Sequence, residues 1–229
     1  MEKLDCSCEG CKLKQLFFAH VSPEKLSEIC QMKTERSYSR GEEIIRQGDS
    51  IGEFSYMKEG LVKLSRKLPD GRDQIISFSG PMDFVGLLSI FSSEVYNYSV
   101  TAIDDSVVCI LDLGMVRSYA QNNALFAFDL MTRFSEATDK IILENLEIKR
   151  KHLRGRVAHV LLYFADNVFG SEEFELSVSR REIAEYIGMT TENVIRTLSE
   201  LRKHEIIRLY GRDIQIVDRK RLQSISDFG

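Results

Sequence analysis

Glu192 and Arg196, four residues apart, carry side chains that can read DNA bases. A carboxylate can accept a hydrogen bond from the cytosine amine, and a guanidinium can donate two hydrogen bonds to one guanine. Four residues is about one helical turn, so on a helix both groups would face the same side and reach neighbouring base pairs. The pair therefore predicts sequence-specific contact with double-stranded DNA.

The cysteines are a second group with chemical potential. The chain has five of them, and Cys6, Cys8 and Cys11 lie close together near its start. An odd count with this clustering indicates a reduced compartment and a metal or redox site better than a disulfide framework. The four histidines are too scattered to indicate an axial ligand.

Catalytic motifs are missing from the sequence. It contains no phosphate-binding loop, no Gly-x-Ser-x-Gly elbow and no His-Glu-x-x-His zinc motif. A catalytic cupin barrel needs clustered histidines, and residues 38–113 contain none. We therefore expect a protein that is not an enzyme.

Two short helices must position the base-reading pair. Ser179 followed by Glu182 is a capping box, which starts a helix that Gly188 ends. Thr190 is the N-cap of a second helix, whose buried face repeats every three to four residues: Val194, Leu198 and Leu201. Two helices that meet at a glycine turn predict a helix-turn-helix.

The second helix would place its outer, N-terminal half in a major groove. A hairpin follows, with strands at 206–209 and 214–217, and it completes a winged helix-turn-helix. The predicted DNA-contacting residues are Ser179, Arg180, Thr190, Thr191, Glu192, Asn193 and Arg196.

Residues 38–113 consist of short apolar runs separated by glycines. Glycine accepts the positive φ of tight turns, so this rhythm predicts many strands in a barrel or roll. The clearest turn is Pro69-Asp70-Gly71, which separates the predicted hairpin strands 61–64 and 74–78.

Apolar residues at three- and four-residue steps predict a long helix over 124–148. Its seam consists of Ala127, Met131, Phe134, Thr138 and Ile141, and Asn145 is placed to fix the register of a paired helix. Because such a seam needs a partner along its length, we expect a homodimer zipped by a helix over about 118–148. The alternative is a helix that packs against its own domain alone.

The overall expectation is an α+β fold of three parts. Residues 1–113 form an N-terminal segment and β-roll sensor, residues 114–150 a dimerisation helix, and residues 151–229 the DNA-binding domain. The net charge is −4, but residues 151–229 carry 13 basic against 12 acidic residues, so this part can face DNA. No apolar run is long enough for a membrane span, and residues 1–10 are acidic and contain cysteines where a leader would be basic and then apolar, so we expect a cytoplasmic protein.

The chain resembles the CRP/FNR family of bacterial transcription regulators over nearly its whole length. The resemblance rests on the roll, the long helix, the segment 179–188 (SRREIAEYIG) and the segment 191–196 (TENVIR). It implies a cyclic-nucleotide-binding-like roll, a palindromic DNA site read by Glu192 and Arg196, and RNA polymerase as a further partner. Thr191 replaces an arginine of the cyclic-AMP branch and Ile195 a serine of the FNR branch, so the half-site sequence stays open.

The resemblance also bears on the signal. Cyclic-AMP regulators hold the nucleotide with a Gly-Glu pair and an arginine, whereas this chain has Gly86-Leu87 and Tyr96-Asn97-Tyr98. Without a cation for the phosphate, cyclic AMP is not the expected ligand. The FNR branch instead binds an iron-sulfur cluster, which implies the ligand set Cys6, Cys8, Cys11 and Cys109, although FNR has a further cysteine where this chain has Phe17.

Three alternatives stay open. The four thiols could hold zinc instead of a cluster, or hold no metal, with Cys109 a buried strand residue and the other three in a tail. Haem or another small molecule in the roll could be the signal. From a different class, the chain could be a non-catalytic ligand-binding module that acts through protein partners.

Overall fold

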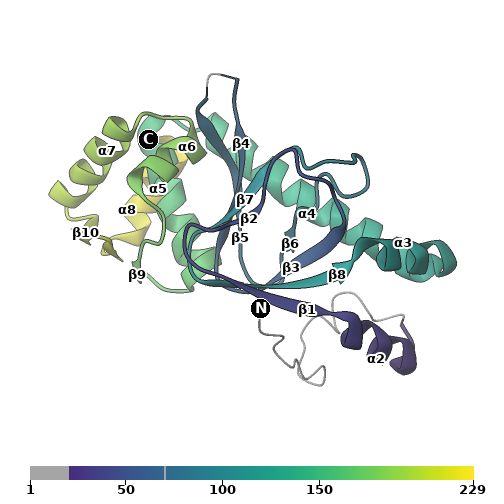
Figure 1. Cartoon of the computed structure of the whole chain (residues 1–229). Helices are drawn as coiled ribbons and strands as arrows, with labels where there is room; N and C mark the ends of the chain where they lie inside the picture. Colours follow the sequence, from purple (N-terminus) through teal and green to yellow (C-terminus); the bar gives the residue numbers. More distant parts are fainter. Residues whose placement is uncertain (1–20, 70) are drawn as a thin grey trace. The chain divides into compact units, whose positions relative to one another are not determined.

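The computed structural model describes residues 21–69 and 71–229, which form two compact units. The first contains residues 21–67 and Ser77–Ile141, and the second contains Leu68–Ile76 and Ile142–Gly229. Helix α4 (Ala124–Arg150) contributes to both units (Figure 1).

The strands before helix α3 (Leu113–Asn122) form two antiparallel four-stranded sheets (Figure 1). One has the order β1-β8-β3-β6: Thr34–Tyr38, Ser106–Asp112, Glu53–Glu59 and Phe84–Val85. The other has the order β2-β7-β4-β5: Glu43–Ile45, Ser99–Ala102, Val62–Lys67 and Asp73–Ser79. The predicted β-roll is confirmed, and the strands expected on either side of the turn at 69–71 are neighbours, β4 and β5.

Glycine is required where β3 turns into β4. Gly60 has φ +90°, and a Cβ atom there would lie 2.3 Å from Ser106 Oγ and 2.5 Å from the Asp105 carbonyl oxygen. The close approach of two chain segments and the left-handed backbone explain why residue 60 is a glycine. Gly60 is one of the glycines whose spacing predicted the roll.

Three helices accompany the sheets of the first unit: α2 (Pro23–Met32), α3 (Leu113–Asn122) and the first part of α4. Their apolar faces share a core with β3 and β8 that includes Ile29, Phe54, Leu111, Val116 and Phe126. The expected start of a dimerisation helix near residue 118 is wrong, because α3 ends at Asn122 and the extended backbone of Asn123 separates it from α4. Asn123 Oδ1 accepts from Phe126 N at 3.0 Å, so a new helix begins there.

Most of the predicted seam of α4 does not lie on its exposed face. Phe134 packs edge-on against Phe84 with ring centroids 6.1 Å apart, and Ala127, Thr138 and Ile141 are half-buried. Met131 is the one predicted seam residue among the exposed large apolar residues of α4, which are Leu125, Phe128, Met131, Ile142, Leu143 and Leu146. Asn145 donates to the Ile76 carbonyl oxygen at 3.1 Å, so its amide is used within the chain.

The second unit packs helices around a three-stranded sheet of order β10-β11-β9: Ile207–Tyr210, Asp213–Ile216 and Glu173–Glu175. Helix α5 (Leu153–Tyr163) continues into the π-helical segment η2 (Phe164–Phe169) and packs against α8 (Arg219–Phe228). Helices α6 (Arg180–Ile187) and α7 (Thr191–Lys203) complete the unit. Among the described residues, no helix is both long and apolar enough to cross a membrane.

Candidate nucleic-acid interface

Helix α6 begins and ends as its sequence predicts. Ser179 Oγ accepts from Glu182 N at 3.1 Å, and Glu182 Oε2 accepts from Ser179 N at 2.8 Å, which confirms the capping box. At the other end Gly188 takes φ +66°, and Met189 N donates to the Ala184 carbonyl oxygen. This left-handed glycine turns the chain toward α7.

Helix α7 presents the predicted base-reading pair on its exposed side. Thr190 Oγ1 accepts from Asn193 N at 3.3 Å and caps the helix, while Val194, Leu198 and Leu201 are buried. Glu192 and Arg196 are exposed, and Thr191 and Asn193 are partly exposed. The helix-turn-helix therefore leaves the first turns of α7 free to enter a groove.

The side chains of Glu192 and Arg196 are both oriented by neighbouring residues at the start of α7. Arg196 Nη2 donates to Asn193 Oδ1 at 2.8 Å. Hydrogen bonds from the backbone N–H of Glu192 and from the Thr190 hydroxyl lower the pKa of the Glu192 carboxyl. Glu192 therefore stays ionised at neutral pH, as a hydrogen-bond acceptor must.

The predicted hairpin after α7 is present, with Tyr210 opposite Asp213 across its turn. Gly211 in the turn has φ +62°, and Tyr210 is 72% exposed. Sequence reasoning missed that β11 also pairs with β9, which ties the wing to the segment that leads into α6.

Two arginines join the wing to the start of α6. Arg180 Nη2 donates to the Gly211 carbonyl oxygen at 2.6 Å. Arg212 donates through Nε and Nη2 to the Leu176 carbonyl oxygen, both at 3.1 Å, and through Nη2 to that of Ser177 at 2.7 Å. Burial, and then the nearby Arg212 charge, lower the pKa of Arg180. Two guanidinium groups therefore lie near each other close to the N-terminus of α6, where phosphate can bind. The contacts of Arg212 were not predicted, because they join residues 35 and 36 positions apart.

Of the four predicted metal ligands, Cys6, Cys8 and Cys11 lie outside the described residues. Cys109 is buried in the core, and its Sγ donates to Glu35 Oε1 at 3.6 Å. Lys33 and Lys58 pair with that carboxylate, with Nζ to oxygen distances of 3.2 and 2.8 Å.

These surroundings give Cys109 the contacts of a neutral thiol in the core. Burial raises the pKa of the Cys109 thiol to about 11, and a thiolate would stand beside the Glu35 carboxylate. Within residues 21–69 and 71–229, no cluster of three or more His, Cys, Asp or Glu side chains could hold a metal ion.

The segment that the resemblance compares with a cyclic-nucleotide site contains two tyrosines. Tyr96 and Tyr98 are buried, and burial raises the pKa of each to about 12, so both stay neutral. A Cβ atom on Gly86 would lie 2.8 Å from Ile45 Cδ1 and 3.0 Å from Tyr96 Cε1. Residues 86–98 contain no lysine or arginine that could pair with a phosphate.

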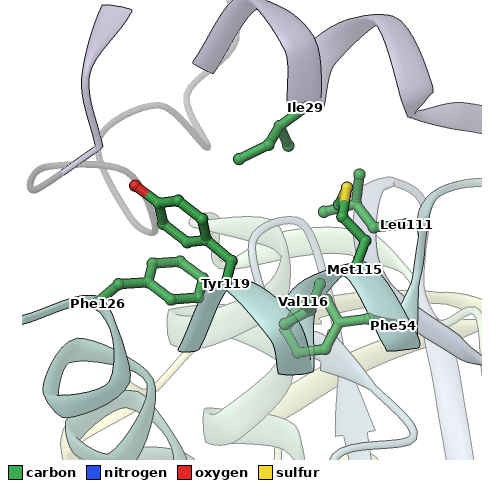
Figure 2. Close-up of a pocket in the computed structure, with 7 residues that line it drawn as sticks. All are labelled: Ile29, Phe54, Leu111, Met115, Val116, Tyr119 and Phe126. Atoms are coloured by element: carbon green, nitrogen blue, oxygen red, sulfur yellow. The ribbon is translucent and has the colours of Figure 1, made fainter. Parts of the chain in front are cut away.

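A small pocket of the first unit lies between α2, α3, α4 and strands β3 and β8 (Figure 2). It is lined by Ile29, Phe54, Leu111, Met115, Val116, Tyr119 and Phe126. Because this lining carries no charge, an occupant would have to be small and apolar.

Two known domain families match separate parts of the chain. The cyclic nucleotide-binding domain family matches residues 35–123, and the Crp-like helix-turn-helix domain family matches residues 155–225. The helix-turn-helix match contains all of α6, α7 and the wing.

Several transcription regulators are similar to this chain over almost its whole length. The nitrogen fixation regulation protein FixK of Bradyrhizobium diazoefficiens is 26% identical over 96% of this chain and 93% of its own length. The transcriptional activator protein FnrL of Cereibacter sphaeroides is 28% identical over 94% and 90%. The structure of FixK2 from Bradyrhizobium japonicum superimposes with a TM-score of 0.75 and 29% identity, covering 84% of this chain and 96% of FixK2.

Proposed function

The chain belongs to the CRP/FNR family of transcription regulators, which bind DNA and form dimers, and we propose that it reads a palindromic DNA site as a homodimer. The observation that carries this proposal is the exposure of Glu192 and Arg196 on the capped first turns of α7. Regulators of this family are not enzymes, in agreement with the missing catalytic motifs.

In this proposal α7 contacts the bases, and the segments around it contact the phosphates. Glu192 accepts from a cytosine amine, and Arg196, held by Asn193, donates to guanine. Ser179, Arg180, Thr190 and Thr191 surround the N-termini of α6 and α7, where backbone N–H groups and positive charge attract phosphate.

The dimer forms along α4. A second copy of α4 would cover the exposed apolar residues of the first. These residues gather toward the two ends of the helix: Leu125, Phe128, Met131, Ile142, Leu143 and Leu146. In this account residues 1–113 are the sensor, 114–150 the dimerisation segment and 151–229 the DNA-binding domain. RNA polymerase is the further partner, and the cytoplasm is where such a regulator meets DNA.

Selection from a random-sequence DNA pool tests the proposal. The full-length protein should enrich a sequence with two inverted half-sites about one or two helical turns apart. Leu146→Glu should yield a monomer by sedimentation that no longer enriches the paired site. Enrichment of no sequence would favour the alternative of a module that acts through protein partners.

The signal is a separate proposal. A redox, oxygen or nitric-oxide signal through an iron-sulfur cluster on Cys6, Cys8, Cys11 and Cys109 is supported by the resemblance to the FNR branch. The surroundings of Cys109 argue against it, so no step of the DNA-binding account depends on a cluster. The competing proposal is haem or a small molecule in the roll.

An iron and acid-labile sulfide assay on protein purified without oxygen decides between them, with Cys8→Ser in parallel. Visible absorption that fades in air and is missing from the variant would support the cluster. A colourless, iron-free dimer that binds its DNA site would exclude the cluster and direct the search to the roll.

A further inference from the structure

Glu144, in the last turns of α4, receives side chains from two helices of the DNA-binding head, here defined as residues 153–229. Its Oε1 lies 2.8 Å from His159 Nε2 of α5, and Tyr186 Oη of α6 donates to the same oxygen at 3.3 Å. The side chains of Glu144 and His159 are 20% and 18% exposed, and Tyr186 is buried. One carboxylate oxygen thus joins three helices of the second unit.

Arg156 connects the same elements a second time. Its Nη1 donates to the Ile187 carbonyl oxygen at 3.0 Å, at the end of α6. Its Nε donates to the Lys151 carbonyl oxygen at 3.0 Å and its Nη2 to that of Lys149 at 3.4 Å. The end of α4 and the end of α6 are therefore held by hydrogen bonds at two places.

These contacts lie immediately before the turn that directs α7. Tyr186 and Ile187 precede Gly188, so a displacement of this end of α6 moves the base-reading helix with it. Apolar contacts alone would let the helices slide, whereas hydrogen bonds to a carboxylate are directional.

Glu144 also stands beside the surface assigned to the second copy. Leu143 and Leu146, on the neighbouring positions of α4, are 61% and 56% exposed. The same helical turn therefore carries both the proposed dimer contact and the attachment of the head.

We propose that Glu144 is a positioning residue for paired half-site recognition. By holding His159 and Tyr186, it fixes the direction of α7 relative to residues 142–150 of α4 and so sets the half-site spacing that the dimer accepts. This inference rests on the proposed function and adds a determinant of spacing to it.

The test compares duplexes that differ only in geometry. They carry the paired site selected by the wild-type protein, the same site with one half scrambled, and paired sites with the spacing changed by one or two base pairs. The variants are Glu144→Ala, Glu144→Gln and Tyr186→Phe. The matched control Glu172→Ala removes a carboxylate that pairs with Arg219 on the surface of the same unit.

Glu144→Ala should lower the preference for the selected spacing about tenfold, the equivalent of one hydrogen bond to a charged group. Its affinity for the single half-site should stay within about twofold of wild type, because α7 itself is intact. Glu144→Gln keeps an acceptor for Tyr186 and should recover part of the preference, Tyr186→Phe should lower it to a smaller extent, and Glu172→Ala should leave it unchanged.

An unchanged spacing preference in folded Glu144→Ala would overturn the inference, as would an equal loss on paired and single sites. If Glu144→Ala does not fold, unchanged preferences in both Glu144→Gln and Tyr186→Phe would overturn it instead. A wild-type protein that selects no paired site would remove the proposed function, and the inference with it.

Discussion

Arg180 Nη2 donates to the Gly211 carbonyl oxygen at 2.6 Å and so joins the first turn of α6 to the turn of the wing. We predict that Arg180→Ala weakens binding of selected and random DNA by a similar factor, because a phosphate contact carries no base information. The slope of log affinity against log salt should become shallower by about one. Equilibrium titrations at several salt concentrations measure both.

Arg219→Ala is the control for Arg180→Ala. It removes one positive charge from the same unit. Arg219 belongs to α8 and pairs with Asp166 of η2, with 2.8 Å between Nη2 and Oδ1. An equal change in the salt slope for both variants would contradict a local phosphate contact by Arg180.

Gly155 allows α5 to pack closely on the C-terminal helix. A Cβ atom at this position would lie 2.8 Å from the Gly229 carbonyl oxygen, 3.0 Å from that of Ile225 and 3.1 Å from that of Ser226. Gly155→Ala should therefore lower the free energy of unfolding by about 1 to 3 kcal/mol, measured by urea denaturation. Gly52→Ala, where the added carbon meets nothing within 4 Å, should change it little.

Met82 adopts φ 78°, a left-handed conformation that costs a side-chain-bearing residue about 1 kcal/mol. Met82→Gly should raise the free energy of unfolding, by less than that amount because glycine also loosens the unfolded chain. Met82→Ala keeps the strained backbone without the long side chain and should give no gain. A gain in Met82→Ala equal to that in Met82→Gly would attribute the effect to the side chain.

The buried tyrosines make the protein sensitive to alkali. Burial raises the pKa of Tyr98 from 10 to about 12, so between these values the unfolded chain is the more readily deprotonated. Neutral Tyr98 therefore makes its full contribution to the free energy of unfolding below pH 10, and this contribution is lost as the pH rises toward 12. By pH 11 the free energy of unfolding should have fallen by about 1 kcal/mol on account of Tyr98. Urea unfolding at pH 8 and pH 11 should show a smaller decrease for Tyr98→Phe than for wild type, and an identical decrease would refute the assignment.

The helix ends in the DNA-binding head could be predicted in detail because the sequence patterns that indicate them are local. The capping box at Ser179 and Glu182, the Gly188 turn and the Thr190 cap each depend on residues within four positions, and the structure has all of them. Local hydrogen bonds and steric limits on φ fix such features almost independently of the rest of the fold.

The periodicity of apolar residues did not predict which face of α4 is buried, because tertiary packing determines it. Helix α4 has apolar residues on more than one face, and spacing alone did not indicate that Phe134 packs inward while Phe128 is exposed. The contacts of Glu144 with His159 and Tyr186 span 15 and 42 residues, and no sequence rule links such positions. The site was therefore predictable at α7, and its attachment to α4 was not.

The most direct test of base reading by α7 is the affinity of Arg196→Ala for the DNA site selected by wild type, in competition with random DNA. We predict a loss of about 1 to 3 kcal/mol on the selected site, relaxed selectivity at one base pair of each half-site, and little change on random DNA. Equal weakening on selected and random DNA would contradict the placement of α7 in the major groove.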